Sequence, residues 1–356
     1  MPDSDERIIP AGTPADAAGW HDRWRRFRSS PYLPATVLVF ILAVAAGLFA
    51  GSYTYILANP TPHRIPVAVV DGDAAVPAAG RGFLDAMDRG LNGALHAVGY
   101  ETPASARAAV EAQRVFAILD VRDATRVTVD VSGASGSSVA EVVTESATAA
   151  GGEARIPVVV TDINPLQPGD PRGLAIFYIT LAAVIIGFVG AIQLTVHARS
   201  LGPWERIGFT VAYALLGGFA IAAVVDWWLG ALSLPFPQSW AILTFTMFTS
   251  GMIFSMFSAL FGRWAMIPTW GVMVLLGNPS SGGAVSWPLL PSVLGAIGRW
   301  LPPGASVNAQ HTAVYFRGHQ HVLPYLVLAG WALVACVVFW IWRDRHPEGP
   351  DPRDTE

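Results

Sequence analysis

Long apolar segments alternate with short polar ones along most of the chain. Five of them have about 20 residues or more and almost no charge: residues 34–57, 173–195, 207–229, 240–261 and 323–342. An α-helix needs about 20 apolar residues to cross the roughly 30 Å hydrocarbon core of a bilayer. Each segment is therefore predicted to be a transmembrane helix. The first segment is too long for the apolar region of a cleaved signal peptide, and the polar stretch before it is too long as well. We therefore interpret it as an uncleaved anchor.

A further apolar segment, Trp264–Leu276, stops early. A helix of its thirteen residues would rise only about 20 Å. A run that no helix tolerates follows it: Gly277, Asn278, Pro279, Ser280, Ser281, Gly282 and Gly283. Backbone that unwinds at membrane depth must be buried in protein or line a wet cavity. The pattern predicts either a broken fifth helix of six, with this run in the substrate pathway, or a short span that leads into a surface loop.

Residues 58–172 have the pattern of a small α/β domain. The first predicted helix has one apolar face that consists of Phe83, Met87, Leu91, Leu95 and Val98. The predicted order is β-α-α-β-β-α-β, with strands at residues 65–71, 115–121, 127–131 and 156–163 and helices at 83–98, 103–113 and 137–150.

The chain after the break is apolar but interrupted. Leu289–Leu301 is predicted to be a helix that lies at the outer surface or dips back into the membrane, and it ends at Pro302-Pro303-Gly304. A group of basic side chains follows before the last span: His311, Arg317, His319 and His321. Three imidazoles could hold zinc in principle, but no acidic or cysteine ligand is nearby, and no metal site is predicted.

Composition agrees with a membrane protein and excludes several kinds of chemistry. Of the 356 residues, 53% are hydrophobic and 13% charged. Every one of the 22 basic residues is arginine, a usage that suggests a bacterial genome rich in GC. Because the chain has no lysine, it has no P-loop lysine, Schiff-base lysine or Ser-Lys dyad. Cys336 is the single cysteine, which excludes a disulfide within the chain. We expect no enzymatic activity, no cofactor and no nucleic-acid partner.

Asp226 is the one acid within the predicted spans, and Trp227 and Trp228 follow it. Tryptophan is enriched where membrane meets water, so the favoured interpretation places Asp226 at the outer interface in a structural role. The alternative is a functional carboxylate inside the membrane, in the substrate pathway.

The distribution of arginine predicts the orientation. If the chain crosses the membrane six times, four arginine-containing ends fall on the same side of it: Arg23–Arg28, Arg199/Arg206, Arg263 and Arg343/Arg345. This side is taken as the cytoplasm. Arg299 and Arg317 fall on the other side. The predicted parts are a cytoplasmic tail with an interfacial amphipathic segment at Trp20–Arg28 (1–33), the first helix (34–57), an extracytoplasmic α/β domain (58–172), a five-helix transmembrane domain (173–343) and a cytoplasmic tail (344–356).

Three segments carry a resemblance to a family. They are IPVAVVDGD directly after the first span, the VEAQRVFAILDV passage, and GNPSSGG with LLPSVLGAIGRWLPPGASVNA at Gly277–Ala309. With the layout of one span, a small α/β domain and five spans, the chain resembles the permeases of bacterial type-2 ABC exporters, and most closely the phage-infection-protein (YhgE/Pip-like) branch. The resemblance covers nearly the whole chain. The α/β domain is far shorter than in the long phage-receptor members, which argues against a receptor or adhesin role.

The resemblance implies a polytopic protein of the bacterial cytoplasmic membrane that moves a lipid, glycoconjugate, peptide or drug-like substrate outward. It also implies a homodimer or paralogous heterodimer, contact with membrane lipids and a separate ATP-binding subunit, and the sequence itself contains no nucleotide-binding motif. The competing interpretation is a non-transporting membrane scaffold or surface protein of the cell envelope or of a secretion system.

A permease without a nucleotide site must receive force through cytoplasmic contacts. The Trp20–Arg28 segment is one candidate, and the loop with Leu201, Pro203, Trp204, Glu205 and Arg206 is the other. A helix that begins near Pro203 would present an apolar knob of Leu201, Trp204 and Ile207, rimmed by Glu205 and Arg206. The alternative is that Trp204 belongs to the inner headgroup belt.

The predicted orientation can be tested with single cysteines in a Cys336→Ala background. Ala78→Cys and Glu348→Cys should react oppositely with a maleimide that cannot cross the membrane, because Ala78 is predicted outside and Glu348 inside. Labelling of both positions from outside intact cells would contradict the orientation.

Overall fold

The computed structural model describes residues 32–58, 60–71, 76–198 and 200–345. It divides into two compact units, Met1–Gly51 and Ser52–Glu356. Most of helix α2 (Tyr32–Leu57), which carries no charged residue, belongs to the first unit. The predicted Trp20–Arg28 segment lies outside the described residues.

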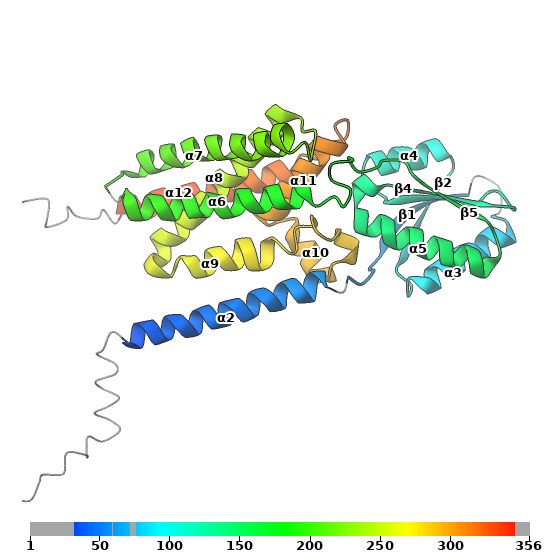
Figure 1. Ribbon diagram of the computed structural model, residues 1–356, viewed down its shortest axis with the longest axis horizontal. Helices are drawn as coiled ribbons and strands as arrows, with labels where there is room; N and C mark the ends of the chain where they lie inside the picture. Colours follow the sequence, from blue (N-terminus) through cyan, green and yellow to red (C-terminus); the bar gives the residue numbers. More distant parts are fainter. Residues whose placement is uncertain (1–31, 59, 72–75, 199, 346–356) are drawn as a thin grey trace, which may run out of the picture. The chain divides into compact units, whose positions relative to one another are not determined.

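The second unit begins with the end of α2 and a small α/β domain (Figure 1). The order of the five strands in the sheet is β2-β1-β3-β4-β5. Neighbouring strands are parallel except for the antiparallel pair β3–β4. The strands are β1 (Ile65–Val70), β2 (Leu95–Tyr100), β3 (Ala117–Asp120), β4 (Val127–Val131) and β5 (Val158–Asp162).

Helices cover both faces of this sheet. On one face, α3 (Ala78–Gly90) and α5 (Ser137–Ala154) form a buried core with alternate residues of β1, and α4 (Pro103–Glu111) does the same on the other face. Every residue of β1 is therefore buried, which explains its unbroken apolar run IPVAVV. A Thr102 side chain that accepts from the Ser105 N–H caps α4, at the predicted start of that helix.

The predicted helix at residues 83–98 is wrong in its second half. Phe83, Met87 and Leu91 are buried as expected, but α3 ends at Gly90 and residues 95–100 form β2. Asn92 and Gly93 have positive φ angles of 54° and 77°, which no helix continues through. Because β2 is an edge strand without a fully buried residue, its sequence lacks the apolar signal of the inner strands. The domain order is therefore β-α-β-α-β-β-α-β.

Four long apolar helices form the rest of the second unit: α6 (Ala175–His197), α7 (Pro203–Ala223) with the π-helical turn η2 (Val224–Trp228), α8 (Phe236–Phe261) and α12 (Leu323–Arg345). With α2, the described chain has five helices long and apolar enough to cross a membrane, as expected of a multi-pass membrane protein. Within this unit α8 is the central helix, because α6, α7 and α12 all pack against it (Figure 1).

Small residues bring α6 close to α8. A Cβ atom at Gly187 would lie 2.6 Å from the backbone oxygen of Met247. The Ser250 hydroxyl donates to the Val184 carbonyl at 2.6 Å, and the Tyr213 hydroxyl of α7 donates to that of Gly187, also at 2.6 Å. Side-chain hydrogen bonds to backbone thus join helices whose apolar side chains gain little from association in lipid.

Short helices occupy the chain between α8 and α12. The short η3 (Gly262–Trp264) leads to α9 (Met266–Trp270), which continues as the π-helical η4 (Gly271–Gly277), so the apolar segment ends early, as the sequence predicts. Then come η5 (Trp287–Leu289), α10 (Ser292–Gly298) and α11 (Pro302–Tyr315). The sequence analysis missed α11, which packs against α6, α8 and α12. Pro302-Pro303-Gly304 was interpreted as the end of a helix, but proline is also favoured in the first turn of a helix, which is its position here.

We predict that Gly187→Ala destabilises the helical block by about 1–3 kcal/mol, because the new methyl group overlaps the α8 backbone. Gly208→Ala in α7 is the matched control, since a Cβ there meets nothing within 4 Å and alanine favours the helix. The melting temperature of each purified variant in detergent measures the effect. Equal melting temperatures would contradict close packing at Gly187.

Candidate functional site

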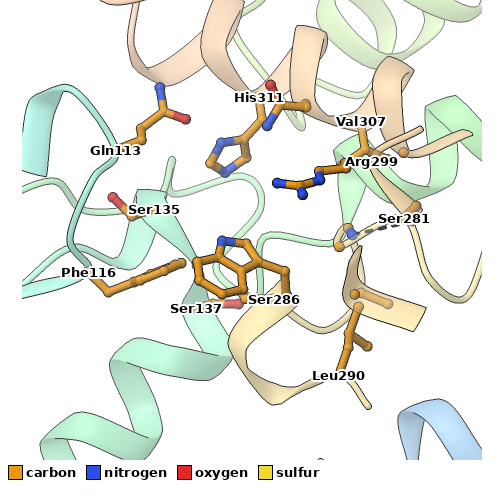
Figure 2. A pocket seen from close by; sticks show the side chains of 18 of the residues that line it. Gln113, Phe116, Ser135, Ser137, Ser281, Ser286, Leu290, Arg299, Val307 and His311 are labelled. Carbon is orange, nitrogen blue, oxygen red and sulfur yellow. Dashed lines mark hydrogen bonds between the residues drawn. The ribbon is translucent and has the colours of Figure 1, made fainter. Parts of the chain in front are cut away.

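A cavity of about 550 Å³ lies where the α/β domain meets the helical block. Its walls come from several distant parts of the chain. From the α/β domain come Gln113, Phe116 and the start of α5, and from the block come residues 280–284, α10 and α11. Figure 2 shows the side chains of Gln113, Arg299 and His311 around this space.

The unwound segment that the sequence singled out forms part of the cavity wall. Of its seven residues, Gly277, Asn278, Pro279, Ser280 and Ser281 are buried and Gly282 and Gly283 partly buried, so the segment is not a surface loop. Ser280 to Gly283 line the cavity. Gly282 has a φ angle of +82°, which glycine adopts without strain.

Side chains of the break form hydrogen bonds with the backbone and with a neighbouring helix. The Ser280 hydroxyl donates to the Leu276 carbonyl at 2.6 Å, which provides a partner for one of the last carbonyls of the helix. The Asn278 amide donates to the Tyr53 hydroxyl at 2.7 Å and so joins the break to the end of α2. The break is therefore a formed structure with its own hydrogen bonds.

Three backbone segments come very close at this break. A Cβ atom at Gly298, the last residue of α10, would overlap the carbonyl oxygen of Ser280. A Cβ atom at Gly304, in the first turn of α11, would overlap the carbonyl oxygen of Gly298. Only glycine fits at either position, and the two glycines fix α10 and α11 against the unwound segment.

The chain after the break attaches to the α/β domain. The His63 N–H donates to the Pro288 carbonyl at 2.7 Å, and the Ser286 N–H donates to the Ser138 hydroxyl at 3.1 Å. Leu289 is buried in the same core as α3 and α5. One continuous segment thus forms the wall of the cavity and holds the α/β domain to the helices.

The cavity is basic. Arg64 and Arg299 line it together with His63, His311 and His321, and none of the described residues that line it is acidic. His311 lies on α11, outside the five long helices, against the rings of Tyr315 and Phe316. Burial lowers the pKa of His311 to about 4, so its imidazole is neutral at pH 7. Arg64 and Arg299 both carry a positive charge at neutral pH.

The structure does not bring Asp226 to this cavity. Asp226 is partly buried in the η2 turn, and the side chains of Trp227 and Trp228 beside it are exposed. Trp227 stacks on Phe236 with ring centroids 4.4 Å apart. The pathway predicted from sequence thus consists of two separate places in the fold.

The predicted coupling residues lie at the other end of the helical block (Figure 1). Helix α7 begins at Pro203 as predicted, with Leu201 two residues before it, and the Glu205 carboxylate accepts from the Gly202 N–H at 2.8 Å as a cap. Trp204 is 71% exposed, and its ring contacts that of Trp340 at 5.9 Å.

Arg206 is not at the rim of an apolar knob, and that part of the prediction is wrong. It is 4% exposed, and its guanidinium donates to the Thr195 hydroxyl at 3.2 Å and to the Ala198 carbonyl at 3.5 Å. These bonds join the start of α7 to the end of α6. The sequence could not show this, because a cationic side chain next to an exposed loop is normally solvated.

Sequence reasoning missed most of the cavity. His311 and His321 were considered only as possible zinc ligands, and no group of three or more metal-binding side chains occurs within the described ranges. Arg64 and Gln113 lie 235 and 186 residues before Arg299, so no local spacing could connect them. The absence of acids around the unwound segment was the one signal available.

Comparison with known proteins adds no family assignment. No protein-family model matches the chain, and neither a curated protein nor a solved structure matches it. The site is therefore interpreted from its own geometry and chemistry.

We predict that Gly298→Ala disrupts the break, because the methyl group would overlap the Ser280 carbonyl. Gly330→Ala is the matched control within α12, where a Cβ meets nothing within 4 Å. Limited proteolysis of the purified variants should show faster cleavage between residues 277 and 304 for Gly298→Ala alone. Unchanged cleavage would contradict the close approach of α10 to the break.

Proposed function

We propose that the chain is the membrane subunit of an outward transporter of the type-2 ABC exporter class. The observation that carries the proposal is the interrupted apolar helix, whose buried, unwound backbone borders a cavity at one end of the helical block. Discontinuous helices are a recurrent way to build substrate sites in transporters, because unwound backbone at membrane depth persists only where protein or a wet cavity surrounds it. The cargo would be a lipid, glycoconjugate, peptide or drug-like molecule.

In this proposal the apolar segment Met266–Gly277 is the shortened fifth of six spans. Exposed tryptophans support a membrane position for the block. Trp227, Trp228, Trp287 and Trp300 lie at helix ends near the α/β domain, and Trp204, Trp264, Trp340 and Trp342 lie at helix ends on the far side. Two such groups are typical of the aromatic belts at the two surfaces of a bilayer. The α/β domain would be extracytoplasmic, and both termini cytoplasmic, in a bacterial inner membrane.

Energy would come from a separate ATP-binding subunit, and the permease would work as a homodimer or a paralogous heterodimer. The exposed Trp204, on the side away from the α/β domain, supports the loop before α7 as the contact with this subunit. Large aromatic side chains often provide much of the binding energy of an interface, about 2–4 kcal/mol on truncation.

We predict that Trp204→Ala lowers the yield of a co-purified ATPase at least tenfold and abolishes stimulation of its activity, because the aromatic anchor is lost. Glu205→Arg should do the same through reversed charge. Glu205→Gln is the matched control, since an amide oxygen can still accept from the Gly202 N–H.

The measurement is affinity purification of the full-length protein from its own host, followed by mass spectrometry and an ATPase assay. An ATPase that binds and responds equally in all variants would exclude this loop as the coupling element. If no ATPase co-purifies with the wild-type protein from cross-linked membranes, the proposed function is wrong and the scaffold interpretation is favoured.

A further inference from the structure

The cavity is lined by several hydrogen-bond donors, and none of the described residues beside them in its lining is acidic. Arg64 and Arg299 are both exposed residues that line it, one directly before β1 and the other directly after α10. The ion pairs of the described α/β domain involve other arginines: Arg89, Arg122 and Arg126. Two guanidinium groups in the lining of one cavity create a positive potential inside it.

The charge of the cavity lining is opposite in sign to the net charge of the α/β domain. Residues 58–172 contain fourteen acidic residues against nine arginines, a net charge of −5. None of the described cavity-lining residues belongs to those acids. Asp170, close to the cavity wall at Gly173, accepts from the N–H groups of Leu174 and Ala175 at the start of α6, and so has its own partners.

A buried donor of the cavity wall also lacks a partner. The amide nitrogen of Gln113 is buried and makes no hydrogen bond to any described residue. A buried polar group without a partner is costly, and such groups are rare in native proteins. Figure 2 draws Gln113, His311 and Arg299 among the side chains that line this space. The imidazole of His311 can add a further donor.

The backbone of Arg64 is unusual as well. Its φ angle is 46°, in the left-handed region that arginine rarely adopts and glycine adopts freely. No helix end explains this conformation, in contrast to Gln113, whose φ of 55° follows the end of α4. Non-glycine residues kept in this region are concentrated at functional sites.

From these observations we infer that the cavity binds a phosphate-bearing anionic group through Arg64, Arg299 and Gln113. Arginine forks and amide donors match the oxygens of phosphate. Trp287 lines the cavity, and the exposed Trp300 follows Arg299, which places the cavity at the level of one aromatic belt. Lipid phosphates lie at this level of a bilayer, so the group can belong to a lipid headgroup, and a soluble phosphate ester is the other source of the same chemistry.

As a statement about cargo, this inference rests on the proposed function and narrows it to anionic, phosphate-bearing substrates. Binding itself is independent of any ATPase. A failure of ATPase co-purification with intact binding would therefore overturn the function alone, and a failure of binding with intact coupling would overturn this inference alone.

The test uses the purified full-length protein in a neutral detergent and measures binding by microscale thermophoresis. The probes are short-chain phosphatidylglycerol, short-chain phosphatidylcholine and inorganic phosphate. We expect phosphatidylglycerol to bind more tightly than zwitterionic phosphatidylcholine, and its affinity to fall with added salt.

Two variants remove the charges with little risk to folding. Arg64→Gly suits the left-handed backbone and removes one guanidinium, and Arg299→Gln removes the other from an exposed position. Each should weaken binding of the anionic probe about tenfold, the loss expected for one charge-assisted hydrogen bond. Arg114→Gln is the matched control, because Arg114 is exposed next to Gln113 but does not line the cavity.

The outcomes separate the two sources. Binding of phosphatidylglycerol that both cavity variants weaken supports a lipid headgroup. Arginine-dependent binding of inorganic phosphate without lipid binding supports a soluble phosphate ester. The inference would be overturned if neither phosphatidylglycerol nor inorganic phosphate binds. It would also be overturned if phosphatidylcholine binds as tightly as phosphatidylglycerol, or if both cavity variants keep the wild-type affinity.

Discussion

Backbone polar groups inside an apolar block must find partners within the protein, and this requirement organises the region where the apolar segment ends at Gly277. The helical hydrogen bonds that are lost where the helix ends must be replaced by bonds to side chains, to other backbone or to water in a cavity. The Ser280 hydroxyl provides such a partner for the Leu276 carbonyl, and the Asn278 amide donates to the side-chain hydroxyl of Tyr53 at the end of α2. The glycines at 298 and 304 let two further backbone segments approach within contact distance. The positions of α10 and α11 follow from this packing.

The same segment determines how the α/β domain is held. Its continuation through Ser286 to Leu289 contributes hydrogen bonds and a buried side chain to that domain. A second connection comes from the linker before α6, where the Gln167 side chain exchanges two hydrogen bonds with the backbone of Ser233 between α7 and α8. The domain is thus attached to the helical block at two places, and a molecule bound in the cavity would touch the domain and the helices together.

Charge gives this junction its chemical character. Hydroxyl, amide and guanidinium groups surround a space without a described acid, although the domain above it is acidic overall. The helical block below offers almost no charge, and Asp226 lies elsewhere, in the η2 turn. In the binding proposed here, a ligand would be selected by its charge at the end of the apolar block.

The sequence by itself determined the elements whose signal is local. Charge-free runs of about 20 residues predicted five long helices because only length and apolarity are needed to cross a bilayer, and inner strands such as β1 were predicted because both of their faces are buried. Elements with a weak or ambiguous local signal were missed: the edge strand β2, none of whose residues is fully buried, and α11, whose opening prolines end a helix as readily as they begin one. The burial of Arg206 and the meeting of Arg64, Gln113 and Arg299 around one cavity were decided by tertiary structure alone. These residues are far apart along the chain or exposed by local pattern, and only the packing of the unwound segment against the α/β domain places them together.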